Sequence, residues 1–144
     1  MTANEEKSDP QQEILNGRGA FGVEYVPKSQ RAPVVDGRVF AGKAGEFSPG
    51  KGKAVHLDRF SIAVFRVGEE FYAIKDACPH AAYPLHKGLM VSEYVVMCNS
   101  HNWRFDVRDG RCVQKGCGHQ PGHELAVRTF AVDREGEEIW IRLS

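Results

Sequence analysis

The sequence contains no apolar run that approaches the length of a membrane span within its 144 residues. Its first residues, MTANEEKSDP, do not combine a basic segment with an apolar stretch, so no secretory signal is predicted. Lys+Arg and Asp+Glu each total 19, and no net charge draws the chain to nucleic acid or to a membrane surface. We therefore expect a cytoplasmic protein with no membrane and no nucleic-acid partner.

Several other features are missing as well. No Gly-rich dinucleotide fingerprint follows a predicted strand, so the chain is not expected to have an NAD(P)H or flavin site of its own. There is no internal repeat and no long amphipathic helix, and the length suffices for one domain but not for two large ones. The 15 Gly and seven Pro instead indicate many turns and short strands.

The chain divides into two parts by composition. Residues 1–37 are predicted to be an N-terminal extension, partly flexible, because the first thirteen are largely polar, four of them acidic, and offer almost nothing to bury. Within it, residues 21–26 alternate well enough for a short strand. A terminal arm packed loosely on the domain is the favoured interpretation, and an arm that docks on a partner or on a second subunit stays open. Residues 38–144 are predicted to form the domain.

The domain is predicted to be all-β, a small antiparallel sandwich or barrel. Short strands are expected at residues 39–41, 53–57, 61–67, 71–74, 93–97, 103–107, 126–132 and 138–143. Residues 68–70 are the expected hairpin turn between the third and fourth strands, and the last two strands are expected to pair with each other.

Four residues in two short motifs form a candidate metal site. Cys78 and His80 make a C-x-H motif, and Cys98 and His101 make a C-x-x-H motif, with 17 residues between His80 and Cys98. Tetrahedral zinc accepts two Cys and two His. A [2Fe–2S] cluster with two imidazoles in place of two thiolates accepts the same set. Zinc knuckles usually place two Cys in one short loop, whereas each loop here offers one sulfur and one nitrogen, which favours the cluster. A structural zinc module remains an alternative.

The flanks of these motifs resemble the Rieske family. The resemblance runs from Ile62 to Arg111: a strand hairpin, then CPH, PL, a Gly turn, CNSH and WRFD, closing on DG. With the terminal hairpin it covers roughly the last hundred residues. It implies a β base with a cluster-binding tip formed by two loops, and one Rieske-type [2Fe–2S] cluster per chain. In this family pattern, Cys78 and Cys98 would bind the inner iron, and His80 and His101 the outer iron, facing solvent.

The sequence departs from the quinol-oxidising branch of that family. That branch has an extra Cys in each ligand loop, where this chain has Tyr83 and Ser100, so the disulfide across the tip cannot form. We also expect no N-terminal membrane anchor of the kind found in that branch. Trp103 and Phe105 stand where that branch has hydroxyl donors to the cluster, which predicts a potential in the low part of the Rieske range. The resemblance is therefore to the soluble ferredoxin branch.

The resemblance implies a one-electron carrier that is not an enzyme by itself and has no catalytic residue. It would be reduced by a flavoprotein reductase and would pass electrons to a terminal oxygenase or reductase, with both partners docking at the cluster tip. One alternative is a small Rieske-like subunit fixed to a larger reductase, such as an assimilatory nitrite reductase.

The remaining cysteines and histidines lie mostly in one Gly-rich segment and read C-x4-C-x-H-x3-H: Cys112, Cys117, His119 and His123. The Rieske pattern assigns no ligand there, and a loop with free thiols is the favoured interpretation. A Cys112–Cys117 disulfide and an adventitious zinc site stay open. His56 and His86 are taken as ordinary residues, with His86 expected near the cluster edge.

Overall fold

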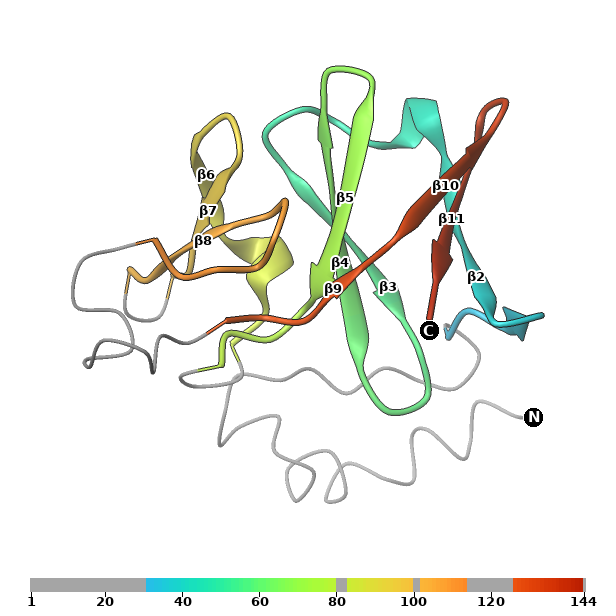
Figure 1. The fold of residues 1–144 in the computed structure, drawn as a ribbon, viewed down its shortest axis with the longest axis horizontal. Coiled ribbons are helices and arrows are strands. Elements are labelled where there is room, and N and C mark those ends of the chain that lie inside the picture. Colours follow the sequence, from blue (N-terminus) through green and yellow to red (C-terminus); the bar gives the residue numbers. More distant parts are fainter. Residues whose placement is uncertain (1–30, 80–82, 100–101, 114–125, 144) are drawn as a thin grey trace, which may run out of the picture.

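The structure, a computed structural model, describes residues 31–79, 83–99, 102–113 and 126–143. This part is built of antiparallel strands in three sheets (Figure 1). Sheet A consists, in spatial order, of β1 (Val34–Val35), β2 (Arg38–Lys43), β11 (Glu138–Arg142) and β10 (Val132–Glu135). Sheet B consists of β3 (Gly52–His56), β4 (Ser61–Val67), β5 (Glu70–Lys75) and β9 (Thr129–Phe130). Sheet C consists of β6 (Leu89–Ser92), β7 (Val95–Met97) and β8 (Arg104–Asp106).

Two short 3-10 helices, η2 (Ala44–Glu46) and η3 (Leu85–Lys87), complete the regular structure of the described ranges. The predicted all-β antiparallel fold is confirmed. No helix among the described residues is both long enough and apolar enough to span a membrane.

Sheet B lies between two hydrophobic cores, and β4 supplies both of them. Ile62 and Val64 face the core shared with sheet A, whereas Ala63 and Phe65 face the core shared with sheet C. All four are at most 1% exposed. A strand that is covered on both faces needs a continuous apolar run instead of alternation, which is what residues 62–65 provide. The seven residues predicted for this strand, 61–67, are those of β4.

The predicted strand at residues 126–132 is wrong in its extent, because the chain changes sheets there. Phe130 pairs with Ala73 of β5 in sheet B, whereas Val132 pairs with Ile141 of β11 in sheet A. Ala131 lies at the change, and its carbonyl accepts a hydrogen bond from the Arg142 N–H at 2.9 Å. The expected pairing with the last strand therefore holds only for β10.

Two strands were not predicted from the sequence. Strand β1 has two residues and pairs only with β2. Strand β6 lies at the edge of sheet C, and its pairing with β7 is interrupted by a register shift between Met90 and Ser92. Leu89 is 57% exposed, so β6 lacks the buried alternation by which a strand is recognised in a sequence.

The predicted boundary after residue 37 stays a prediction. Residues 1–30, including the strand expected at 21–26, lie outside the described residues. Val34 and Val35 are paired with β2, and the Ala32 N–H donates to the His56 carbonyl at 2.7 Å. The last residues before the boundary are thus hydrogen-bonded to β2 of sheet A and to the end of β3 of sheet B.

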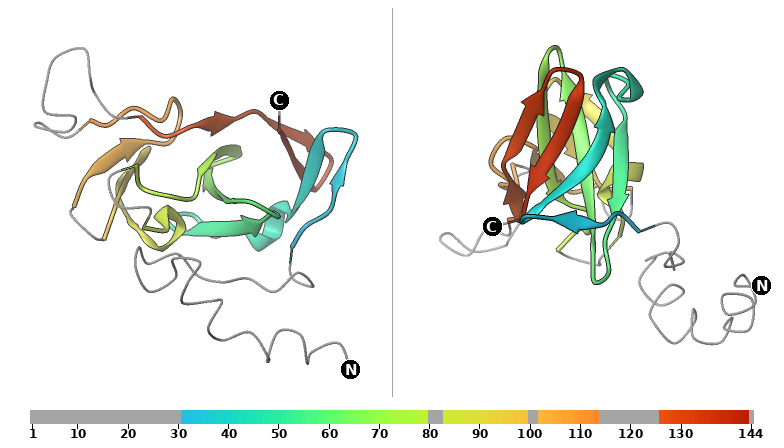
Figure 2. Two further views of the ribbon diagram at one scale, coloured as in Figure 1. Left: turned by 90° about the horizontal axis from the view of Figure 1, so that it is seen from below. Right: turned by 90° about the vertical axis from the view of Figure 1, so that its right-hand side faces the viewer.

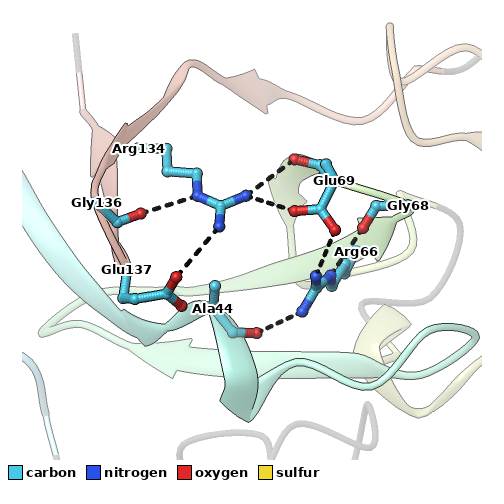
Figure 3. Close-up of polar contacts among 7 residues, drawn as sticks. All are labelled: Ala44, Arg66, Gly68, Glu69, Arg134, Gly136 and Glu137. Atoms are coloured by element: carbon cyan, nitrogen blue, oxygen red, sulfur yellow. Dashed lines mark hydrogen bonds and ion pairs between the residues drawn. The ribbon is translucent and has the colours of Figure 1, made fainter.

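A network of charged side chains joins sheets A and B at one end of the molecule (Figure 3). Glu69, in the β4–β5 turn, accepts hydrogen bonds from Arg66 at 3.1 Å and from Arg134 of β10 at 3.0 Å. The hydrogen bond from Arg134, and after it the one from Arg66, lowers the pKa of Glu69 below its ordinary value. The Arg134 guanidinium also lies 3.6 Å from Glu137. Glu69 is largely exposed, so the network orients the β4–β5 turn and the β10–β11 turn but adds little stability. Both turns lie at the top of Figure 1.

In the turn that follows β8, the backbone of Gly110 lies close against that of Val127. A Gly→Ala substitution, which adds one methyl group, tests this contact. Gly110 has φ +79°, and a Cβ there would clash with the Val127 carbonyl oxygen. Gly136 has φ +63°, but a Cβ there would meet nothing within 4 Å. We expect Gly136→Ala to lower the free energy of unfolding by about 1 kcal/mol, the cost of the left-handed conformation. Gly110→Ala should cost several times more, because backbone must move, and denaturant unfolding of both variants measures the difference. Equal losses would contradict the tight contact.

Candidate metal centre

The first candidate ligand follows the end of β5. Beyond Lys75, the Asp76 N–H donates to the Ser61 carbonyl at 2.8 Å, which continues the β4–β5 pairing for one more residue. Cys78 comes two residues later and is 1% exposed. Sheet B therefore holds the start of the first ligand loop, and the Cys78 thiol is buried against the core between sheets B and C.

The second candidate ligand follows β7 directly. Met97 is the last residue of β7, and Cys98 is 0% exposed. Strand β7 is the middle strand of sheet C, held by β6 on one side and by β8 on the other. Sheet C thus delivers Cys98 to the same core that buries Cys78.

Each of the two ligand loops is closed by a backbone hydrogen bond between equivalent positions. The Cys78 N–H donates to the Tyr83 carbonyl at 2.8 Å, and the Cys98 N–H donates to the Trp103 carbonyl at 2.7 Å. In both loops the acceptor lies five residues after the cysteine. In each loop the bond ties the first residue to the last, so the two ends of the loop are held together.

The second loop has two further constraints. Asn102 has φ +63° and donates its N–H to the Cys98 carbonyl at 2.9 Å. Asn tolerates this left-handed conformation better than most residues. The Asn99 side chain donates from Nδ2 to the Lys87 carbonyl at 2.8 Å, which attaches the loop to η3.

The surroundings of the two thiols fit a metal centre held by sulfur. Cys78 and Cys98 are not in disulfides, and they lie in one apolar cluster with Phe65, Leu85 and Phe105. Two unoxidised thiols that are brought into one dry core from separate loops are suited to bind one soft or borderline metal ion as thiolates. His80 and His101 lie outside the described residues. In the part of the chain that is described, no three His, Cys, Asp or Glu residues gather into a metal site.

One contact near the loops was missed by the sequence interpretation, which treated His86 as ordinary. The His86 Nδ1 lies 2.6 Å from Asp76 Oδ2, and the His86 N–H donates to Asp76 Oδ1, also at 2.6 Å. The Asp76 side chain is 2% exposed. No spacing rule pairs residues ten apart in an irregular segment, so only an acidic residue before Cys78 hinted at this contact. His56, by comparison, shares a 2.7 Å hydrogen bond with the Ser61 hydroxyl at the β3–β4 junction.

A second buried carboxylate stabilises the turn after β8. Asp106 accepts two hydrogen bonds from the Arg108 guanidinium, at 3.0 and 2.8 Å, and these lower its pKa from the ordinary value. Arg108 also lies over the Tyr94 ring, 4.0 Å from its centroid. Tyr94 in turn contacts Tyr72 edge to face, and the hydrogen bond from Tyr72 to Glu70 raises the pKa of Tyr72 to about 12.

The favoured interpretation of Cys112 as a free thiol is wrong. Cys112 is disulfide-bonded, the state that had stayed open as an alternative. It is 8% exposed and packs in the core between sheets B and C. Its backbone pairs with that of Phe105 in an isolated antiparallel β-bridge. Cys117, His119 and His123 lie outside the described residues, so a further metal site there stays untested.

Comparison with known proteins decides the family. The family model of the Rieske [2Fe-2S] domain matches residues 37–131. The chain belongs to the Rieske [2Fe-2S] domain family. Its resemblance to that family, first noted from the CPH and CNSH motifs, is confirmed.

Several proteins similar to this chain are ferredoxin components of dioxygenase systems. The biphenyl dioxygenase ferredoxin subunit of Pseudomonas sp. (strain KKS102) is 36% identical over 99 residues, covering 69% of this chain and 85% of that protein. The solved ferredoxin of carbazole 1,9a-dioxygenase from Nocardioides aromaticivorans IC177 has a TM-score of 0.64 at 30% identity, covering 74% of this chain and 98% of that one. A complex of reduced oxygenase and oxidized ferredoxin in carbazole 1,9a-dioxygenase matches with a TM-score of 0.67 at 23% identity, over 76% of this chain and 96% of the matched chain. The last likeness shows the fold alone.

Membership of the family implies a Rieske-type [2Fe–2S] cluster, and the two buried cysteines fit it. The N–H groups of both cysteines are used within the protein, in the bonds that close the loops. The protein frame therefore positions the two sulfurs with backbone hydrogen bonds and apolar contacts.

Phe105 offers a test of how this core sets the cluster potential. It is 0% exposed and lies in the same apolar cluster as Cys78 and Cys98, where it provides no hydrogen-bond donor. A donor to a ligand sulfur stabilises the extra negative charge of the reduced centre, by about 1 kcal/mol for one ordinary hydrogen bond. We expect voltammetry to give a wild-type potential in the low part of the Rieske range and a higher potential for Phe105→Tyr. A wild-type value near the top of the range would contradict this account.

Proposed function

We propose that the protein is a Rieske-type ferredoxin that carries single electrons to an oxygenase. The observation that carries the proposal is the pair of buried, reduced cysteines at the roots of two matching loops in a Rieske domain. A relative supports it, because the biphenyl dioxygenase ferredoxin subunit of Pseudomonas sp. (strain KKS102) is 36% identical and this chain spans 85% of it. We assign no catalytic residue and regard the chain as the electron-transfer component of an oxidoreductase system.

The proposed ligands are Cys78 and Cys98 for the inner iron and His80 and His101 for the outer iron, with one cluster per chain. The burial of both cysteines supports the first half of this assignment. The second half follows from the C-x-H and C-x-x-H motifs, which place each histidine two or three residues beyond its cysteine. A Rieske-type cluster accepts and releases one electron. The chain's own part is to keep the thiolates in a dry, rigid core.

The proposed partners are an oxygenase as electron acceptor and a flavoprotein reductase as donor, both docking at the cluster tip in the cytoplasm. A solved complex of a similarly folded ferredoxin with its oxygenase supports the first partner. The reductase is inferred from the chain's lack of a dinucleotide fingerprint. Contacts of this kind are small and short-lived, so a few charges near the tip should govern them.

The cluster assignment predicts a red-brown protein with two irons and two acid-labile sulfides per chain and a Rieske-type EPR signal after reduction. Replacing His80 or His101 with Ser should abolish or alter that signal, because each removes an imidazole from one iron. Iron and sulfide analysis with EPR on the purified protein measures both effects.

His56→Ser is the control for these variants, because His56 lies at the end of β3 and its ring hydrogen-bonds to Ser61. It should leave the signal unchanged. A colourless protein with one zinc per chain would replace the proposal with a structural zinc module.

The docking assignment predicts that charges near the tip matter more than those at the far end. Lys87 ends η3, and Arg104 begins β8 directly after the second loop; both are exposed. Reversing either charge to Glu should slow reduction of the purified oxygenase, measured by stopped flow at low salt. Glu137→Lys and Glu138→Lys are the matched controls, since the β10–β11 turn lies away from sheet C in Figure 1. Equal effects at both ends would argue against tip docking.

A further inference from the structure

The short helix η3 lies between the two ligand loops and is attached to both of them. In the chain it follows Tyr83, where the first loop closes, and it precedes β6 and β7, which lead to Cys98. In space it packs on β3 and β4 of sheet B, between sheets B and C (Figure 1; Figure 2). Its buried residue, Leu85, is 0% exposed and lies in the apolar cluster of both cysteines.

The attachment to the first loop is the buried Asp76 carboxylate. Asp76 precedes Cys78 by two residues, and its side chain is 2% exposed. A buried carboxylate is costly unless its oxygens accept hydrogen bonds. His86 supplies one bond to each oxygen, from its backbone N–H and from its ring, both at 2.6 Å. The carboxylate oxygen accepts from Nδ1–H, and this bond orients the ring.

The attachment to the second loop is Asn99, the residue after Cys98. Its Nδ2 donates to the carbonyl of Lys87, the last residue of η3, at 2.8 Å. A chain of hydrogen bonds therefore runs from Asp76 through residues 86 and 87 to Asn99, from the root of one ligand loop to that of the other.

Backbone contacts leave η3 little room to shift. A Cβ on Gly52 of β3 would lie 2.9 Å from the His86 Cα and 3.0 Å from its carbonyl oxygen. A Cβ on Gly88 would clash with the Met97 carbonyl oxygen, immediately before Cys98. Glycine is needed at both places because the backbones of β3 and β7 lie against the helix from opposite sides.

We propose that Asp76, His86 and Asn99 form a clamp that sets the separation of the two ligand loops, so that His86 is a positioning residue for the cluster and not one of its ligands. Mutation of residues that hold metal ligands in place typically costs roughly 10–100-fold in metal affinity. This inference rests on the proposed cluster. It adds that the sulfur ligands are held through a histidine with no metal contact of its own.

The test compares His86→Ala with His86→Asn in the purified holoprotein. Alanine removes the ring donor, whereas the Asn side-chain amide can occupy nearly the position of Nδ1–H and donate to Asp76. We expect His86→Ala to lose iron to a chelator about tenfold faster than the wild type and to broaden the EPR lines of the reduced protein. His86→Asn should restore both to near wild-type values.

Ile139→Ala is the control for a general loss of stability. Ile139 is fully buried between sheets A and B, in the core that does not contain the cysteines. This variant should unfold at a lower temperature by circular dichroism, yet keep the wild-type EPR line shape and iron-release rate at temperatures where it is folded. Equal iron release from His86→Ala and Ile139→Ala would show a merely structural role and overturn the clamp, as would a His86→Asn variant no better than alanine.

If His86→Ala does not fold, Asn99→Ala tests the clamp instead, because Asn99 is exposed and its replacement leaves both hydrophobic cores intact. It should also release iron faster than the wild type, and a wild-type rate would overturn the clamp. The proposed function fails separately: a wild-type protein without a Rieske EPR signal would contradict the cluster itself, whereas a normal wild type with an unaltered His86→Ala would contradict only the clamp.

Discussion

The rest of the structure depends on the burial of β4 on both faces. Ile62 and Val64 close the core toward sheet A, and Ala63 and Phe65 close the core toward sheet C. Fully burying a Val, Ile or Phe side chain stabilises a fold by about 1.5–3 kcal/mol, so the three large side chains of this strand account for a large share of a small domain's stability. Since both cores share this strand, the base and the cysteine-bearing loops are parts of one cooperative unit.

That arrangement suits an electron carrier. A group that gains and loses an electron works best in a site that changes little between the two states, and sites built on strands are more rigid than sites built on loops alone. Here the cysteines lie at strand ends, Cys98 directly after β7 and Cys78 shortly after β5. The segments beyond them are short and are closed by backbone hydrogen bonds. The sheets therefore fix the two ends of each loop.

Charged side chains far from the ligand loops are mostly paired with one another. The formal net charge is zero, and many charges of sheet A are compensated locally. Asp133 interacts with Arg38 and Arg142, and Glu69 links Arg66 to Arg134. Such exposed pairs add little stability, but they cancel one another's long-range field. These paired charges of the base therefore contribute little to the steering of a partner.

The sequence by itself determined the β class, the central strand, the family and the four candidate ligands, because each rests on local pattern. The apolar run at residues 62–65, the turn residues and the C-x-H and C-x-x-H spacings are all readable without long-range contacts. Strand β6 escaped recognition because it buries little. The change of sheets at Ala131 escaped because nothing local tells which neighbour a strand residue will pair with. Only the tertiary structure brought His86 to Asp76 and Asn99 to Lys87, and only it put Cys112 in a disulfide. The two hydrogen-bonded contacts join irregular segments, whose geometry follows from the packing of the sheets around them and not from any periodicity in the chain.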